Sequence, residues 1–190
     1  MKSLSIPPVS DEDELIVHVI NRQRWSGFPK VTQISTLKLS PDIDFLQIDD
    51  YKKTTIGYEF KLIKYHKGRK RANLMTFYTG IGEALHYFQF GVDRSYLVLG
   101  LSNEIPRQSR NSALDKISEF ITTFISFKKH YGLNCFGIIL LDLSTDKFVE
   151  LLPATDNLPM MGEEVKHLKN CLLLKQFRYD KKLKEEFLQE

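Results

Sequence analysis

Cysteine is scarce in this chain, and long apolar runs are missing from it. The 190 residues include two cysteines, Cys135 and Cys171, each followed by apolar residues, which predicts buried thiols in a reducing compartment. No apolar run approaches the roughly 18–20 residues of a membrane span. The first ten residues carry one lysine and no apolar core, unlike a secretory signal. These absences predict a cytoplasmic, DNA-accessible location and no membrane partner.

Motifs for zinc, for redox chemistry and for nucleotide cofactors are also missing. The chain has no Cys-x-x-Cys pair, and its five histidines show no metal-ligand spacing, which argues against a zinc site. Gly80 and Gly82 stand one residue apart, but no apolar strand leads into them, so they do not form a phosphate-binding loop. We therefore expect no organic cofactor.

The composition is that of an ordinary globular protein. Hydrophobic residues make up 42% and charged residues 27%, and the net charge is +3. This mildly basic balance is compatible with nucleic acid without arguing for it. The length suits one domain spanning residues 1–190. Within it we expect a loose N-terminal arm at 1–9 and a charged tail at 179–190.

Hydrophobic periodicity predicts alternating helices and strands. A helix starts with Ser10 as the capping residue, continues to about Trp25 and ends at Gly27. The later helices and strands are expected in the order helix, strand, helix, strand, strand, helix. The expected ranges are a strand at 31–39, a hairpin from 41 to about 63, and then 73–90, 96–99, 109–130, 135–143, 148–152 and 163–177. This order predicts an α/β fold, a central mixed β-sheet flanked by helices on both faces.

The hairpin at 41–61 carries the most informative pattern. Its second strand alternates, so Glu59 and Lys61 lie on one face. If the hairpin closes, Asp44 of the first strand lies beside Glu59. Paired carboxylates are hard oxygen ligands for Mg²⁺ or Mn²⁺. A bound ion lowers the pKa of its water, and a neighbouring lysine can stabilise developing charge. These are the parts that phosphodiester hydrolysis needs.

The order of these residues resembles the PD-(D/E)xK nuclease superfamily, in which an acid opens one strand and Glu-x-Lys follows on the next. Glu59-Phe60-Lys61 supplies the Glu-x-Lys. Asp42, in Pro41-Asp42, matches the literal letters, whereas Asp44 precedes an apolar pair; we favour Asp44. The resemblance covers roughly residues 10–143. It implies a restriction-endonuclease-like core, a Mg²⁺ or Mn²⁺ held by Asp44, Glu59 and the Phe60 carbonyl, and Lys61 orienting the attacking water.

Related junction resolvases often carry a glutamate on the first helix that reaches the metal site. Glu14 is the better placed candidate for this catalytic role, with Glu12 second; both acids also simply suit a helix N-terminus. The family helix after Glu-x-Lys often bears a glutamine and, one turn on, a tyrosine. Here these places hold Glu83 and Tyr87. Tyr87 is expected to contact nucleic acid, whereas Glu83 departs from the pattern and leaves its role open.

A basic run follows the second strand of the hairpin and places five cations in eight residues. A solvated loop is the ordinary interpretation of such a run. Its position beside the expected site favours contacts to DNA phosphates, which position a duplex without reading its sequence. The residues expected to bind nucleic acid here are Lys64, Lys67, Arg69, Lys70 and Arg71.

These patterns predict a divalent-metal-dependent DNA endonuclease, possible substrates being branched DNA or Holliday junctions cut by a homodimer. A catalytically silent nucleic-acid-binding protein on the same fold is the alternative. A third hypothesis is an interaction protein that docks a partner through the basic run and the tail.

Overall fold

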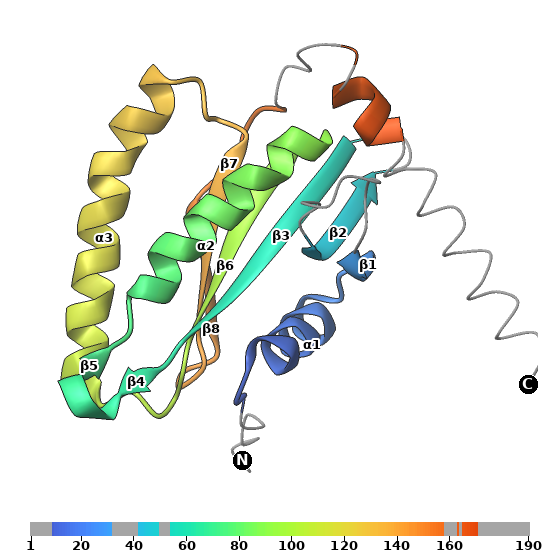
Figure 1. Cartoon of the computed structure of the whole chain (residues 1–190). Helices are drawn as coiled ribbons and strands as arrows, with labels where there is room; N and C mark the ends of the chain where they lie inside the picture. Colours follow the sequence, from blue (N-terminus) through green and yellow to red (C-terminus); the bar gives the residue numbers. More distant parts are fainter. Residues whose placement is uncertain (1–8, 32–41, 50–53, 158–162, 164, 171–190) are drawn as a thin grey trace, which may run out of the picture.

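The computed structural model describes residues 9–31, 42–49, 54–157, 163 and 165–170. Within them, one mixed sheet runs in the order β1-β2-β3-β6-β7-β8 (Figure 1). The central strands β3, β6 and β7 are parallel, and β1, β2 and β8 run antiparallel to their neighbours. The strands are β1 (Phe28–Val31), β2 (Ile43–Asp49), β3 (Thr54–Ile63), β6 (Arg94–Leu101), β7 (Phe136–Asp142) and β8 (Lys147–Leu152).

Helices cover both faces of this sheet, as expected. Helix α1 (Glu12–Gln23) packs on one face, where Val98 of β6 contributes to its cluster. Helices α2 (Met75–His86) and α3 (Arg107–His130) pack on the other, together with Leu97 and Leu99 of the same strand. Side chains alternate between the faces of a strand, so neighbouring β6 residues feed two separate cores. The α/β prediction with a mixed sheet is confirmed.

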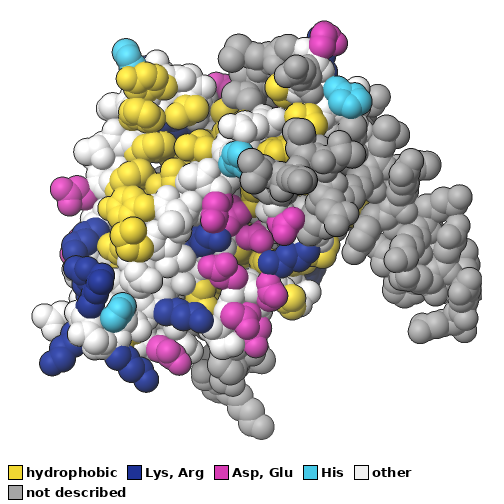
Figure 2. All heavy atoms as spheres, in the orientation of Figure 1, with side chains coloured by type: hydrophobic (Ala, Val, Ile, Leu, Met, Phe, Trp, Pro, Cys, Tyr) yellow, Lys and Arg dark blue, Asp and Glu magenta, His cyan; other side chains and the backbone are white. Residues whose placement is uncertain are grey.

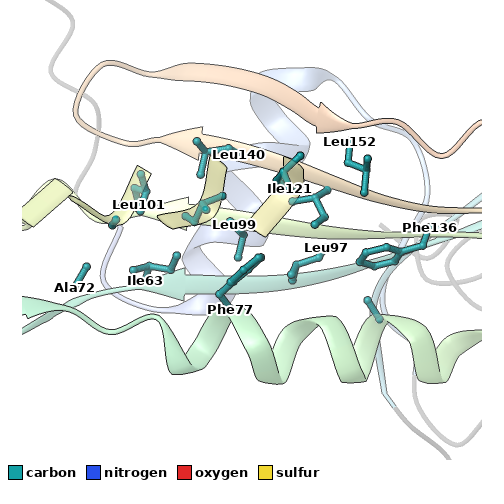
Figure 3. Close-up of a cluster of buried hydrophobic side chains, with 14 of the residues drawn as sticks. Ile63, Ala72, Phe77, Leu97, Leu99, Leu101, Ile121, Phe136, Leu140 and Leu152 are labelled. Carbon is teal, nitrogen blue, oxygen red and sulfur yellow. The ribbon is translucent and has the colours of Figure 1, made fainter. Parts of the chain in front are cut away.

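The larger core lies between the sheet and helices α2 and α3. Figure 3 shows Phe77 of α2 and Ile121 of α3 directed at Leu97 and Leu99. The strands β6 and β7 are buried along almost their whole length, as parallel strands covered on both faces must be. This packing fixes β3, which carries the Glu-x-Lys residues, at the centre of the molecule.

Helix α1 differs from the sequence prediction at both ends. Asp11, not Ser10, is the N-cap, and its carboxylate accepts a hydrogen bond from the Glu14 backbone at 2.9 Å. The helix ends at Gln23, and Arg24 adopts the left-handed conformation expected of a glycine. Gly27 serves another purpose: a Cβ there would lie 2.5 Å from the carbonyl oxygen of Leu46. It lets the chain pass close to β2.

The strand expected at 31–39 lies outside the described residues, apart from Val31, which ends β1. The hairpin at 41–61 is confirmed by antiparallel pairing of Asp49 with Thr54. The basic run forms a small ribbon, β4 (Tyr65–His66) and β5 (Arg71–Ala72), around the turn η1 (Lys67–Arg69). Helix α2 gives way to the 3-10 helix η2 (Tyr87–Phe90).

The last expected helix is helical at Glu163 and at 165–170, and its remainder lies outside the described residues, as does the tail. Of the arm expected at 1–9, residues 1–8 also lie outside them, whereas Val9 is not loose but is buried in the core cluster of α1. Among the helices that the structure describes, none combines the length and the apolar character needed to span a membrane.

Candidate functional site

The hairpin brings Asp44 to the Glu-x-Lys strand. Pairing between β2 and β3 stops at Phe45 and Tyr58. One step beyond, the carboxylate of Asp44 accepts a hydrogen bond from the Phe60 backbone N–H at 2.9 Å. A side-chain oxygen thus occupies the place of the next strand–strand hydrogen bond. Both backbone groups of a strand residue point to the same edge, so the Phe60 carbonyl faces this side of β3 as well.

Tyr87 links the strand that carries Asp44, β2, to the strand that carries Glu59, β3. Its hydroxyl donates to Glu59 and lies 3.2 Å from the backbone oxygen of Asp42, while the Asp44 N–H donates to it at 3.4 Å. Asp42 thus contributes its backbone, and Asp44 contributes its side chain. Tyr87 is fully buried, so the prediction that it contacts nucleic acid is corrected. Tyr87 is the first residue of η2, directly after α2, and its ring packs with buried residues of β1 and β2.

Lys61 lies at the centre of a carboxylate cluster. Its ammonium nitrogen is 2.5 Å from Glu59, 2.7 Å from Glu83 and 3.6 Å from Glu12. Glu83 of α2 therefore belongs to the site. Glu14 does not reach it: its carboxylate accepts hydrogen bonds from the backbone N–H and hydroxyl of Ser10 at 2.6 and 2.9 Å. Glu12 faces the sheet because it precedes the buried residues Leu15 and Ile16 by three and four positions and so shares their face of the helix, whereas Glu14 lies on another face and caps the helix start.

Sequence reasoning missed Lys30. Its ammonium lies 2.8 Å from Asp13 and 3.2 Å from Asp44, so it links α1 to β2 across the edge of the sheet. No local sequence pattern predicts this contact, because it forms only when β1 pairs with β2. In Figure 2 a group of acidic side chains gathers near the middle of this face. The ion pairs of the cluster join two lysines, Lys30 and Lys61, to five carboxylates, those of Glu12, Asp13, Asp44, Glu59 and Glu83.

This crowding of negative charge shifts the proton affinities in the cluster. Burial and the nearby carboxylate of Asp44 raise the pKa of Glu59 to about 8. Burial alone would lower the pKa of Lys61, but its hydrogen bonds to Glu59 and Glu83 outweigh burial and raise it. Burial opposes the ionised form of Glu83 too, yet its hydrogen bonds to Glu59 and Lys61 lower its pKa. Lys61 therefore stays cationic, and Glu83 is its ionised partner.

The donor atoms suit a hard divalent cation. Asp44, Glu59 and the Phe60 carbonyl offer oxygens only, which favours Mg²⁺ or Mn²⁺ over zinc. The excess of carboxylates over lysines leaves negative charge for such an ion to neutralise. Among the described residues, no three His, Cys, Asp or Glu side chains are grouped so that they could hold an ion together. A site here would therefore combine two carboxylates with the backbone carbonyl and water.

The basic ribbon follows β3 and precedes α2 in the chain, and both of these elements contribute residues to the cluster. Its cations are all exposed. Exposed lysine and arginine side chains of this kind can contact the phosphates of a nucleic-acid backbone. The structure places there Lys64, Lys67, Arg69, Lys70 and Arg71.

Comparison with known proteins does not indicate which reaction or ligand this site serves. No protein-family model, curated protein or solved structure matches the chain.

Proposed function

We propose that this protein is a divalent-metal-dependent DNA endonuclease of the PD-(D/E)xK type. The observation that carries the proposal is the convergence of Asp44 with Glu59 and Lys61. The Asp44 carboxylate meets the backbone of Phe60, between the two Glu-x-Lys residues, at 2.9 Å. The sheet around these residues would then be the restriction-endonuclease-like core that the resemblance implies.

The residues at the centre of the site would have distinct roles in this reaction. Asp44, Glu59 and the Phe60 carbonyl would hold Mg²⁺ or Mn²⁺, which supplies charge neutralisation and an acidified water. Lys61 is cationic and placed to orient that water and to stabilise the charge that develops on the phosphate. Tyr87 holds Glu59 in place by its hydrogen bond. The exposed cations of the basic ribbon would bind the flanking phosphates.

Branched DNA or a Holliday junction is the substrate we propose within this class, cut by a homodimer that places two sites on two strands. A small catalytic domain whose cations contact only the DNA backbone would respond to DNA shape more than to sequence.

Cleavage assays test the proposal. Supercoiled plasmid and a four-way junction are incubated with Mg²⁺ or Mn²⁺ and with wild-type protein, Asp44→Asn, Glu59→Gln or Lys61→Ala. We expect loss of cutting in the carboxylate variants and a reduction of about 10²–10⁴-fold for Lys61→Ala. Circular dichroism confirms that each variant is folded. Undiminished cutting by folded Asp44→Asn and Lys61→Ala would refute the assignment.

Helix α1 supplies a matched control. Glu12 and Glu14 lie on the same helical turn, but only Glu12 approaches Lys61. Glu12→Gln should reduce cutting, whereas Glu14→Gln should weaken the helix cap and leave cutting intact. The reverse ranking would show that Glu14, the first choice from the sequence, is the outer acid.

A catalytically silent nucleic-acid-binding protein is the second candidate, and Glu83 favours it. Its carboxylate lies 2.7 Å from the Lys61 ammonium, which Glu59 already contacts. A lysine held by two carboxylates is less free to act on water. Calorimetry with Mn²⁺ distinguishes the two: DNA binding without metal binding would support the silent protein.

A further inference from the structure

A row of aromatic rings runs from helix α2 along the C-terminal half of helix α3. It begins at Tyr78 of α2, whose ring centroid lies 6.1 Å from that of Phe120 on α3. Phe120 stacks on Phe124 at 5.2 Å, and Phe124 stacks on Phe127 at 5.4 Å. Phe127 then meets Tyr131, just beyond the helix, at 4.5 Å. Each ring thus contacts the next along the C-terminal half of α3.

The two ends of this row are open to solvent, whereas Phe120 and Phe124 between them are half-buried against the core. Tyr78 is 52% exposed, Phe127 47% and Tyr131 63%, and Met75 beside Tyr78 is 62% exposed. Figure 2 shows the row as a band of hydrophobic side chains that ends near a group of lysines and arginines. Exposed aromatic residues in a contiguous band mark a binding surface more often than a packing defect.

Charged side chains of α3 lie beside the band. Residues three or four apart share a face of a helix, so Lys116 lies one turn before Phe120 on the α3 face that also carries Phe127. Asp115 lies on another side of the helix, and Glu119 flanks this face, three residues after Lys116 and four before Thr123. The face consists of Ser109, Ser112, Lys116, Phe120, Thr123, Phe127 and His130.

At the end nearer the carboxylate cluster, the band opens into a hollow of about 210 Å³ between the basic ribbon and the two helices. Arg69, Arg71 and Lys116 line it together with Tyr78 and Met75. Cations and an exposed ring therefore share one concave surface. A ligand that has both flat apolar groups and negative charge would contact the ring and the cations together.

We propose that this band and hollow bind single-stranded nucleic acid. Arg69, Arg71 and Lys116 contact backbone phosphates, and the exposed rings stack on bases, which is the usual combination in sequence-tolerant single-strand binding. From Lys116 to Tyr131 the helix rises roughly 22 Å. That length holds no more than about six nucleotides at the 3.4 Å spacing of a stacked strand.

This binding does not depend on cleavage. If the proposed nuclease function also holds, the band adds a preference for DNA with a single-stranded flank, since Tyr78 lies on the same helix as Glu83. A protein partner on an apolar face is the competing occupant. The shared lining of cations and rings favours a polyanion with flat bases over an apolar protein helix.

Fluorescence anisotropy in EDTA, where no metal-dependent cutting can occur, tests the proposal with a labelled dT12 oligonucleotide. We expect affinity to fall about five-fold or more for each of Tyr78→Ala, Phe127→Ala and Tyr131→Ala. Ile125→Ala is the matched control, because Ile125 is 51% exposed on another face of α3. Lys116→Ala should lower the salt slope of binding by about 0.7, and Lys129→Ala should not.

Sedimentation velocity on the same variants separates the two occupants. Weaker dT12 binding with an unchanged oligomeric state is the expected result. Ring variants that bind dT12 as tightly as Ile125→Ala would overturn the proposal. So would variants that lose dT12 binding only as they dissociate into smaller species, because the band would then be an interface between copies of the chain. Failure of cleavage leaves these results unaffected.

Discussion

Glu59 is a carboxylate that the fold removes from water and places beside a second one. Its ordinary pKa of 4.5 rises to about 8 in the folded protein, through burial and the charge of Asp44. Between these values the folded state binds more protons than the unfolded state, so the free energy of unfolding falls as pH increases. Each tenfold change in proton affinity corresponds to about 1.4 kcal/mol, so we expect a loss of a few kcal/mol at most.

Urea unfolding in EDTA from pH 5 to 9 measures this loss. In Glu59→Gln the uncharged amide cannot titrate, and the curve should be flatter over the same range. Lys61 and Glu83 do not interfere, because the pKa of Lys61 is raised and that of Glu83 is lowered, away from this window. Identical pH profiles for the two proteins would show that Glu59 does not titrate there.

At the level of single residues, local periodicity predicted only part of the cluster. Asp44, Glu59 and Lys61 could be placed together, because strand alternation and one hairpin decide their faces. Lys30 could not, because its contact depends on the pairing of β1 with β2. The choice between Glu12 and Glu14 depended on the buried face of α1, since Glu12 shares that face with Leu15 and Ile16 and Glu14 does not.

Helix α2 rests on the sheet through one glycine and exposes another. A Cβ at Gly80 would lie 2.6 Å from a methyl group of Leu97 and 2.7 Å from Cγ of Lys61, whereas a Cβ at Gly82 meets nothing within 4 Å. Alanine is a better helix former than glycine by about 1 kcal/mol. Gly82→Ala should therefore stabilise the protein by up to that amount.

Gly80→Ala should instead destabilise it by about 1–3 kcal/mol through overpacking, and should also disturb Lys61. Chemical denaturation of the two variants gives the comparison. Equal effects of the two substitutions would mean that α2 does not pack closely at Gly80. The sequence indicated that this glycine pair had a packing reason, but not which member required it.

The turn of helix at 165–170 is fastened to the sheet by a buried ion pair. The Lys169 ammonium lies 2.6 and 2.8 Å from the two carboxylate oxygens of Asp93. Asp93 also accepts hydrogen bonds from the backbone N–H and hydroxyl of Thr55. Lys169→Met leaves a buried carboxylate without its cation, which costs about 3–5 kcal/mol.

Thermal and urea unfolding check this cost against Lys166→Met, because Lys166 forms an exposed pair with Glu163 in the same turn. That control should change stability by less than about 1 kcal/mol. The double variant Asp93→Asn/Lys169→Met should recover part of the loss. If Lys169→Met were as mild as its control, the ion pair would not hold this segment.

For the whole molecule, the sequence predicted the class of the fold but not its arrangement. Apolar strands preceded by helices imply a sheet covered on both faces. The strand order β1-β2-β3-β6-β7-β8 depends on contacts between residues far apart in the chain, which periodicity does not reveal. The ribbon β4–β5 was expected to be a loop, because charge dominates its composition and two-residue strands leave no period to detect.

The molecule separates its charges: carboxylates gather around Lys61, and exposed cations line the neighbouring ribbon. Without a divalent ion, the carboxylates should repel DNA phosphates that the ribbon attracts. Unit charges 4 Å apart interact by about 1 kcal/mol in water and by more near a protein surface. The double variant Asp44→Asn/Glu83→Gln should therefore bind DNA in EDTA about tenfold more tightly than the wild type.

Anisotropy with a labelled four-way junction measures this difference, with Asp146→Asn/Glu104→Gln as a control that removes two carboxylates outside the cluster. Ca²⁺, a hard cation that takes oxygen ligands, should raise the affinity of the wild type and of the control but not that of Asp44→Asn/Glu83→Gln. Equal affinity of all three proteins, in EDTA and in Ca²⁺ alike, would mean that DNA does not approach the carboxylates. The ribbon would then bind DNA over some other part of the surface, and the cluster would not be the site that cleaves the phosphodiester bond.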